Sequence, residues 1–432
     1  MNDPFQGLLA DLLKMIGGAT ASPTAWLDAA RSLAQGVATD GQPEENADPL
    51  IRIRLEELGR VAELHVADTT GLPFDRATTL VPVGRGAWAL RTLDAWTPTL
   101  ARVVEAQRGA AGGSPGSGSP GSGSPGSGTA SGGPLPRPPG ADGTEQTGTP
   151  GLDRWGGDVP RPFGMDEGFE ELIGRFATTM GPVLVGMQFG SAAGHLAQRA
   201  LGQYALPLPW PASAEVLIVP DNVARFAGDW SLPPDEARLW VCVRELAAHV
   251  VLGQPHVASR VRELVDAVTA EMVATQQGLA ERIGGEAGDP EALQRILSDP
   301  ESLLADLLTP GQRRTSDELV AVTTVVAAYV DHVTGRVAGT LTGVAGALSE
   351  AWYRYQIEES SSVQAAGALF GLDLGREQVD RGAAFVRGVV ERAGQDGLAR
   401  LWDDPRHLPT PAEVDAPGLW LERIDLPELP GG

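Results

Sequence analysis

Residues 244–257 read RELAAHVVLGQPHV, and this stretch decides how the rest of the chain is interpreted. Its apolar residues recur at the spacing of a helix, and it differs from the helical zinc motif H-E-x-x-H at both histidines. Arg244 stands at the first histidine position and Ala248 at the second, while His249 comes one residue late. The stretch therefore leaves three alternatives open: a displaced zinc site, a lost zinc site, or an ordinary amphipathic helix.

Glu245 and His249 are the residues of this helix that could bind a metal. They lie four residues apart and share one helix face, where a hydrogen-bonded or solvated pair is the simplest expectation. Zinc usually takes three or more ligands from the protein, and these two residues fall short of that. His256 lies beyond Gly253 and Pro255, on an expected loop, and could approach His249 after a turn. Glu245, His249 and His256 therefore remain an alternative ligand set.

The surrounding sequence predicts a mainly α fold with a small β-sheet, in the α+β class. Pro234 and the acidic residues after it predict the start of the helix that carries the opening stretch and ends near Gly253. The β-branched run at residues 215–220 predicts a strand. Residues 315–318, TSDE, have the pattern of a capping box and predict the start of a second long helix.

Residues 1–107 are expected to form an N-terminal helical region. Within it, Leu55, Leu58, Val61 and Leu64 follow a period near 3.6 residues, which predicts one buried stripe. Composition changes abruptly after this region, because the sequence SPGSG occurs three times between residues 114 and 128. Such sequence has no apolar face.

Residues 108–161 are therefore expected to form a long disordered linker rich in Gly, Ser and Pro. Residues 162–432 are expected to form the main helical domain.

The formal net charge of −23 makes nucleic-acid and membrane-surface partners poor expectations, because such a surface repels phosphates and anionic lipid. Cys242 is the one cysteine, which excludes an intrachain disulfide and a thiolate zinc cluster. The first residues lack a cationic start followed by an apolar block, so a cytoplasmic location is expected.

A set of blocks in one order extends the analysis from the opening stretch to the whole chain. The blocks are PFQGLLADLL, AELHVADTTGLP, ALGQYALPLP, IVPDNVARFA, LWVCVRELAAH, AAYVDHV, RGAAFVRGVVERAG and LPTPAEVDAPGLWLERI. In this order they resemble the bacterial family of zincin-like metallopeptidases and hydrolases. The resemblance covers nearly the whole chain apart from the predicted linker, and it implies a zincin-like helical fold.

The resemblance also implies a set of roles for an active relative. The two histidines of H-E-x-x-H and a downstream carboxylate hold zinc, which lowers the pKa of its bound water. The glutamate of the motif takes the proton of that water, and a further aspartate orients a ligand histidine.

Carried onto this sequence, the three ligand positions are Arg244, Ala248 and Ala327. Glu245 retains the general-base type, and Asp331 retains the carboxylate behind a ligand. His332 also matches the family block, where the expected role is structural.

The sequence therefore predicts a zincin-like protein with a degenerate zinc site, which acts as an inactive scaffold, binding protein or regulator. One alternative is an active zinc hydrolase with another ligand set, and a second is a helical assembly protein whose linker tethers two halves. The expected partner is an unidentified protein or peptide, and zinc is an expected cofactor only under the first alternative. Arg244 is expected to turn towards the vacated metal position and pair with Asp331, Glu245 or both.

Overall fold

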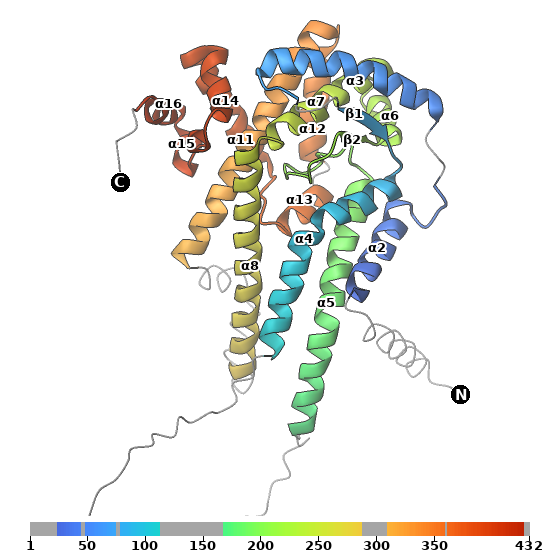
Figure 1. Cartoon of the computed structure of the whole chain (residues 1–432), viewed down its shortest axis with the longest axis vertical. Helices are drawn as coiled ribbons and strands as arrows, with labels where there is room; N and C mark the ends of the chain where they lie inside the picture. Colours follow the sequence, from blue (N-terminus) through green and yellow to red (C-terminus); the bar gives the residue numbers. More distant parts are fainter. Residues whose placement is uncertain are drawn as a thin grey trace, which may run out of the picture.

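The computed structural model describes residues 24–44, 48–74, 78–112, 167–286, 309–358 and 361–426 (Figure 1). This part of the chain is mainly helical with a small parallel sheet, as the sequence predicts. The α-helices are α2 (Ala25–Ala38), α3 (Pro49–Thr70), α4 (Arg85–Gly112), α5 (Glu167–Ala197), α6 (Pro220–Asp229), α7 (Pro234–Leu252), α8 (Pro255–Glu286), α11 (Pro310–Leu341), α12 (Ala345–Glu358), α13 (Ser361–Ala368), α14 (Arg376–Ala399), α15 (Pro411–Asp415) and α16 (Pro417–Asp425). Two short 3₁₀ helices, η1 (Arg400–Trp402) and η2 (Pro405–His407), follow α14.

The sheet joins two segments that are far apart in the sequence. Strand β1 (Thr79–Pro82) pairs in parallel with β2 (Glu215–Ile218), with Thr79 opposite Glu215. The strand predicted at residues 215–220 is confirmed, although it ends earlier because Pro220 begins α6. The pairing brings together parts of the chain from before and after residues 113–166.

Close helix packing joins the same two parts of the chain again. Helix α5 presents Gly186 and Gly190 to α2, and a Cβ on either would lie 2.3–2.4 Å from the carbonyl oxygen of Trp26 or Ala30. Only glycine allows the two backbones to approach this closely. The segments on either side of the predicted linker therefore share one hydrophobic core. The predicted linker itself lies outside the described residues, except for residues 108–112 at the end of α4.

Helix α7, which carries the opening stretch, lies at the centre of this core. It begins at Pro234, with Asp235 and Glu236 in its first turn, and it ends before Gly253, as the sequence predicts. Helices α3, α6 and α11 pack around it. Most of its side chains are buried, which explains why its sequence is apolar on more than one face.

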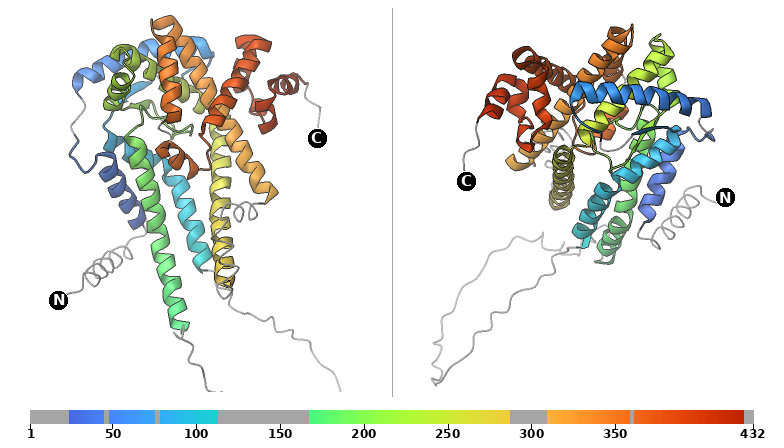
Figure 2. Two further views of the ribbon diagram at one scale, coloured as in Figure 1. Left: turned by 180° about the vertical axis from the view of Figure 1, so that it is seen from behind. Right: turned by 45° about the horizontal axis from the view of Figure 1, so that its top comes forward.

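Figures 1 and 2 show how the remaining helices are arranged around α7. Helices α4, α5 and α8 extend away from the end of the molecule that holds the sheet, and α14, α15 and α16 lie together beside α11. Within the described ranges, no helix has a segment that is both long and apolar enough to cross a bilayer.

Two local predictions from the sequence are wrong. Helix α11 begins at Pro310 with a capping box between Thr309 and Gln312, several residues before the predicted box at 315–318. In α3, Leu55 is buried, but the predicted stripe does not continue, since Val61 is 42% exposed and Leu64 is 69% exposed.

Candidate functional site

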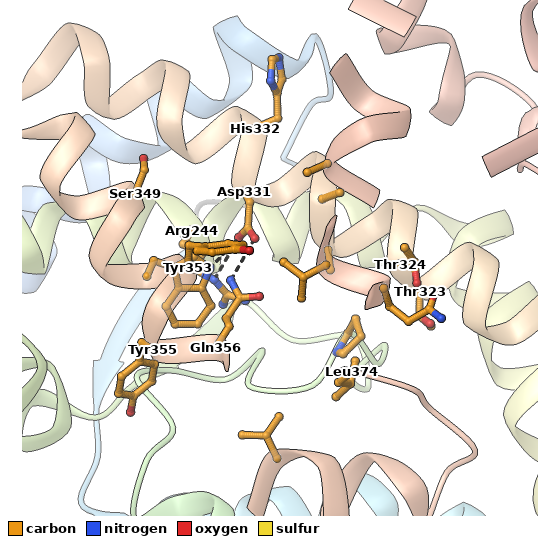
Figure 3. Close-up of a pocket in the computed structure, with 18 of the residues that line it drawn as sticks. Arg244, Thr323, Thr324, Asp331, His332, Ser349, Tyr353, Tyr355, Gln356 and Leu374 are labelled. Atoms are coloured by element: carbon orange, nitrogen blue, oxygen red, sulfur yellow. Dashed lines mark hydrogen bonds and ion pairs between the residues drawn. The ribbon is translucent and has the colours of Figure 1, made fainter. Parts of the chain in front are cut away.

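A cavity of about 490 Å³ lies between α7, α11, α12 and α14 (Figure 3). Helix α11 contributes Thr324, Ala327 and Asp331, and α7 contributes Arg244 and Glu245. Most of the remaining lining is apolar or aromatic and comes from α12, α13, α14 and the segment before β2. The structure therefore brings four of the sequence-predicted site residues to one cavity, namely Arg244, Glu245, Ala327 and Asp331.

Arg244 lies between the two carboxylates of this group. Its Nη1 donates to Glu245 Oε1 at 2.9 Å and to the backbone carbonyl of Tyr204 at 3.3 Å. Its Nε lies 3.7 Å from Asp331 Oδ1, which is within ion-pair distance but too far for a hydrogen bond. The guanidinium carbon lies 4.3 Å from the ring centre of Trp352, in the geometry of a cation–π contact. The predicted ion pairs of Arg244 with both carboxylates are thus confirmed.

Glu245 is held by hydrogen bonds on both of its carboxylate oxygens. Oε1 accepts from Arg244, and Oε2 accepts from the backbone N–H of Tyr204 at 2.7 Å. The side chain is only 1% exposed. Gly202 permits this contact, because a Cβ on Gly202 would lie 2.5 Å from Glu245 Cδ. Burial raises the pKa of the Glu245 carboxyl, and the charge of Arg244 opposes that rise.

Asp331 lies on α11 and faces the cavity with a side chain that is 30% exposed. Trp352 Nε1 donates to Oδ1 at 3.0 Å, and Gln356 Nε2 donates to Oδ2 at 3.1 Å. Both donors come from α12, one turn apart. Burial raises the pKa of Asp331, and Arg244 and these two donors oppose the rise. Figure 3 shows Asp331 directed towards Arg244, whereas His332, which also lines the cavity, points away from Arg244.

The two alanines at the matched ligand positions differ in their surroundings. Ala327 lines the cavity, so the space that a longer side chain would fill there is open. Ala248 lies one turn after Arg244 on α7 and is buried in the core. Neither side chain has an atom that can bind a metal.

The alternative ligands His249 and His256 have other neighbours. The hydroxyl of Tyr204 lies 2.9 Å from His249 Nδ1, and burial lowers the pKa of His249. His256 is the second residue of α8, not a loop residue as the sequence suggested, because Pro255 begins that helix. Burial lowers the pKa of His256. The negative charge of Asp404 opposes this effect, and His407 adds to it. Within the described part of the chain, His, Cys, Asp and Glu side chains form no group of three or more with metal-binding geometry.

The residues at this site do not fit the zinc that a zincin-like fold implies. An arginine side chain has only N–H donors and no lone pair for a metal, and alanine has no donor atom. The positive charge between Glu245 and Asp331 is that of the Arg244 guanidinium. His332, the further matched residue, bonds through Nε2 to Gln395 Oε1 at 3.0 Å.

Several site residues could not be identified from the sequence. Trp352 and Gln356 hold Asp331 from α12, and Tyr204 holds Glu245, Arg244 and His249 through its backbone and hydroxyl. Aromatic and amide residues are common, and no spacing marks these three as partners of the carboxylates. Gly202 is the one sequence feature that could indicate a close approach of this segment to α7, because a glycine leaves room for Glu245.

The comparisons with known proteins agree with this architecture. Residues 26–421 match the family described as "Zincin-like metallopeptidase". No curated protein matches the chain. Among solved structures, the chain is similar to the crystal structure of a "putative hydrolase with a novel fold" from Chloroflexus aurantiacus, with a TM-score of 0.57 and 20% identity. The similarity covers 93% of this chain and 99% of that one, and at this identity it shows a shared fold alone. Because the family match spans nearly the whole sequence, the chain belongs to the zincin-like metallopeptidase family.

Proposed function

We propose that this chain is a catalytically inactive member of its family, which acts in the cytoplasm as a binding or regulatory protein. The observation that carries the proposal is the place of Arg244, whose guanidinium lies against Glu245 and Asp331. A buried carboxylate needs a nearby positive charge, and the guanidinium supplies a permanent one. Arg244 therefore supplies a positive charge beside both carboxylates without a divalent cation.

The state of Glu245 supports the same proposal. A general base must reach a water molecule or substrate with a free carboxylate oxygen. In this chain one oxygen accepts from Arg244, the other accepts from Tyr204, and the side chain is 1% exposed. Glu245 has become a structural contact between α7 and the segment after α5.

The cavity supports a retained binding role. It measures about 490 Å³, which is within the usual range of ligand pockets, and charged side chains lie beside an apolar lining. An inactive scaffold without a ligand would gain stability from filling this space.

Neither alternative function gains support from the contacts. The ligand set of Glu245, His249 and His256 is disfavoured, because His249 pairs with Tyr204 while Asp404 and His407 act on His256. A protein of two tethered halves is disfavoured by the shared core of the segments on either side of residues 113–166.

Peptide hydrolysis tests the proposal. The full-length protein is incubated with fluorescent casein and a mixed peptide library, with added zinc or with a chelator, beside the matched Glu245→Gln variant. We expect the wild-type protein to hydrolyse no more than Glu245→Gln under any of these conditions. Hydrolysis that requires zinc and disappears in Glu245→Gln would overturn the proposal.

A further inference from the structure

We propose that the cavity binds a small uncharged molecule with a carboxamide-type head on an aromatic or aliphatic body. In this arrangement the carbonyl oxygen of the head accepts from Arg244, and its N–H donates to Asp331. The inference rests on the proposed function, since it names the ligand class of the cavity that has lost its metal-binding residues.

Arg244 has donors that no protein group satisfies. A guanidinium carries five N–H bonds. Nη1 uses its two for Glu245 Oε1 and the carbonyl of Tyr204. Nε is buried without a hydrogen bond. The hydrogen bonds of Arg244 to the described residues all come from Nη1, so Nη2 has no partner among them. Because the side chain lines the cavity, Nη2 is the donor that remains for a ligand. Nε of the same guanidinium is buried, and buried donors normally have a partner.

Asp331 supplies acceptor capacity beside that donor. Its two oxygens accept one hydrogen bond each, from Trp352 and Gln356, although a carboxylate oxygen can accept more than one. The side chain is 30% exposed and lines the cavity, with Oδ1 3.7 Å from Arg244 Nε. A donor and an acceptor side by side match a carboxamide, whose carbonyl oxygen and N–H group are attached to the same carbon.

The charges at this end of the cavity favour an uncharged head. Arg244 contributes one positive charge, and Glu245 and Asp331 contribute two negative charges when ionised. A carboxylate ligand would add a third negative charge beside Asp331. An ammonium ligand that approached Asp331 would lie beside the guanidinium of Arg244. Charge repulsion is stronger beside protein than in bulk water, and a carboxamide avoids both cases.

The rest of the cavity suits an apolar body. Helix α14 lines it with Val379, Ala383, Val386 and Val390, beside the polar Gln378, Arg387 and Glu391, and Leu374 lies in the segment before that helix. Trp352, which stacks on Arg244, also lines it and provides an aromatic surface at the polar end. Figure 3 shows Arg244, Asp331 and Gln356 gathered at one place, with Leu374 and Thr324 on a different side.

Three probes with one body test the head group. Naphthamide, naphthoate and naphthylmethylamine are titrated against the full-length wild-type protein near neutral pH, with binding followed by saturation-transfer NMR. We expect naphthamide to bind about tenfold or more tightly than either charged probe, which corresponds to about 1.4 kcal/mol. Equal or tighter binding of naphthoate or naphthylmethylamine, or no saturable binding of naphthamide, would refute the assignment.

Two neighbouring alanines test the location. Ala383 and Ala384 are both exposed on α14, but only Ala383 lines the cavity. Ala383→Leu should weaken naphthamide about tenfold or more, because the added atoms occupy the space of the naphthalene body. Ala384→Leu should leave the affinity unchanged. If both variants weaken the probe equally, or neither does, the probe binds elsewhere and the assignment is wrong.

Asp331→Asn tests the head group from the protein side. Removing the negative charge should tighten the binding of naphthoate relative to that of naphthamide. A purely structural role of Asp331 would leave the ratio of the two affinities unchanged. An unchanged ratio of the two affinities would contradict the assignment. These readouts are separate from hydrolysis: the probes can fail to bind an inactive protein, and zinc-dependent hydrolysis can appear in a protein that binds them.

Discussion

Arg244 and Glu245 are adjacent in the sequence, and Arg244 Nη1 donates to Glu245 Oε1 at 2.9 Å. Neighbouring residues of a helix ordinarily point in different directions. Here the long arginine side chain turns back, so that the charge at the first matched ligand position neutralises the carboxylate at the matched general-base position. Both side chains are largely buried, with exposed fractions of 12% and 1%.

Replacing Arg244 by methionine should destabilise the protein strongly. Glu245 would lose its charge partner while remaining buried, and removing one member of a buried pair typically costs about 3–5 kcal/mol in the free energy of unfolding. Denaturant titration of the purified variant measures the effect. The loss should shrink in the double variant Arg244→Met with Glu245→Gln, because no uncompensated carboxylate is left at position 245.

Arg238→Met is the matched control on the same helix. Arg238 pairs with Asp235, whose side chain is 60% exposed, so its removal should cost less than about 1 kcal/mol. A loss of similar size in Arg238→Met and Arg244→Met would mean that Arg244 acts as an ordinary surface residue.

Gly202→Ala should destabilise through contact with Glu245. The added Cβ would lie 2.5 Å from Glu245 Cδ, so the segment or the carboxylate must shift, at a cost of about 1–3 kcal/mol. Gly228→Ala is the control in α6, where a Cβ would meet nothing within 4 Å, and alanine should stabilise the helix by about 0.5–1 kcal/mol. Thermal unfolding of the two variants compares them. Equal stability of the two proteins would show that Glu245 does not lie against Gly202.

The stability of the protein should depend on the ionisation of Glu245. Burial raises the pKa of Glu245 in the folded state above its ordinary value of 4.5, so the folded state holds this proton more tightly than the unfolded state. The contribution of Glu245 is therefore most favourable below pH 4.5 and is lost as the pH rises through the higher folded-state pKa.

Denaturant unfolding from below pH 4.5 upward measures how the free energy of unfolding depends on pH, with Glu245→Gln as the test variant. The variant should show a smaller fall in unfolding free energy with rising pH than the wild-type protein does. Glu215→Gln, at a side chain that is 53% exposed, is the control for the loss of a surface carboxylate. Identical pH profiles for the wild-type protein and Glu245→Gln would contradict the assigned environment.

The sequence predicts the elements around the site well where a strong local signal exists. Pro234 and Gly253 mark the two ends of α7, and the run before Pro220 marks β2. The start of α11 was misplaced because two capping patterns occur within a few residues of each other. The structure uses Thr309 and Gln312, where Pro310 provides a favourable first helical residue.

The buried face of α3 could not be predicted from its large residues. The helix approaches β1 through Gly59, where a Cβ would lie 3.1 Å from Leu80 Cδ1. Small residues therefore face the core beside Leu55, and Val61 and Leu64 remain exposed. Apolar periodicity identifies a stripe of large residues, and it does not show which neighbouring element needs a small residue for close approach.

The ion pairs of the site could be predicted from the residue types, but the hydrogen bonds that hold the carboxylates in place could not. Two carboxylates and an arginine at or beside the matched ligand positions predict an ion pair, because buried charges require partners. The contacts from Trp352, Gln356 and Tyr204 depend on how α12 and the segment after α5 pack on α7 and α11. That packing is a long-range property of the fold, with no marker in the local sequence.

Zinc content tests the central claim most directly. The wild-type protein and the variant that combines Arg244→His, Ala248→His and Ala327→Glu are each incubated with one equivalent of zinc, desalted, and analysed by native mass spectrometry and elemental analysis. The account predicts no stoichiometric zinc in the wild-type protein and one zinc in the variant, because the three substitutions restore donors at the matched positions. One tightly bound zinc per wild-type chain, lost in Glu245→Gln or His249→Ala, would contradict it.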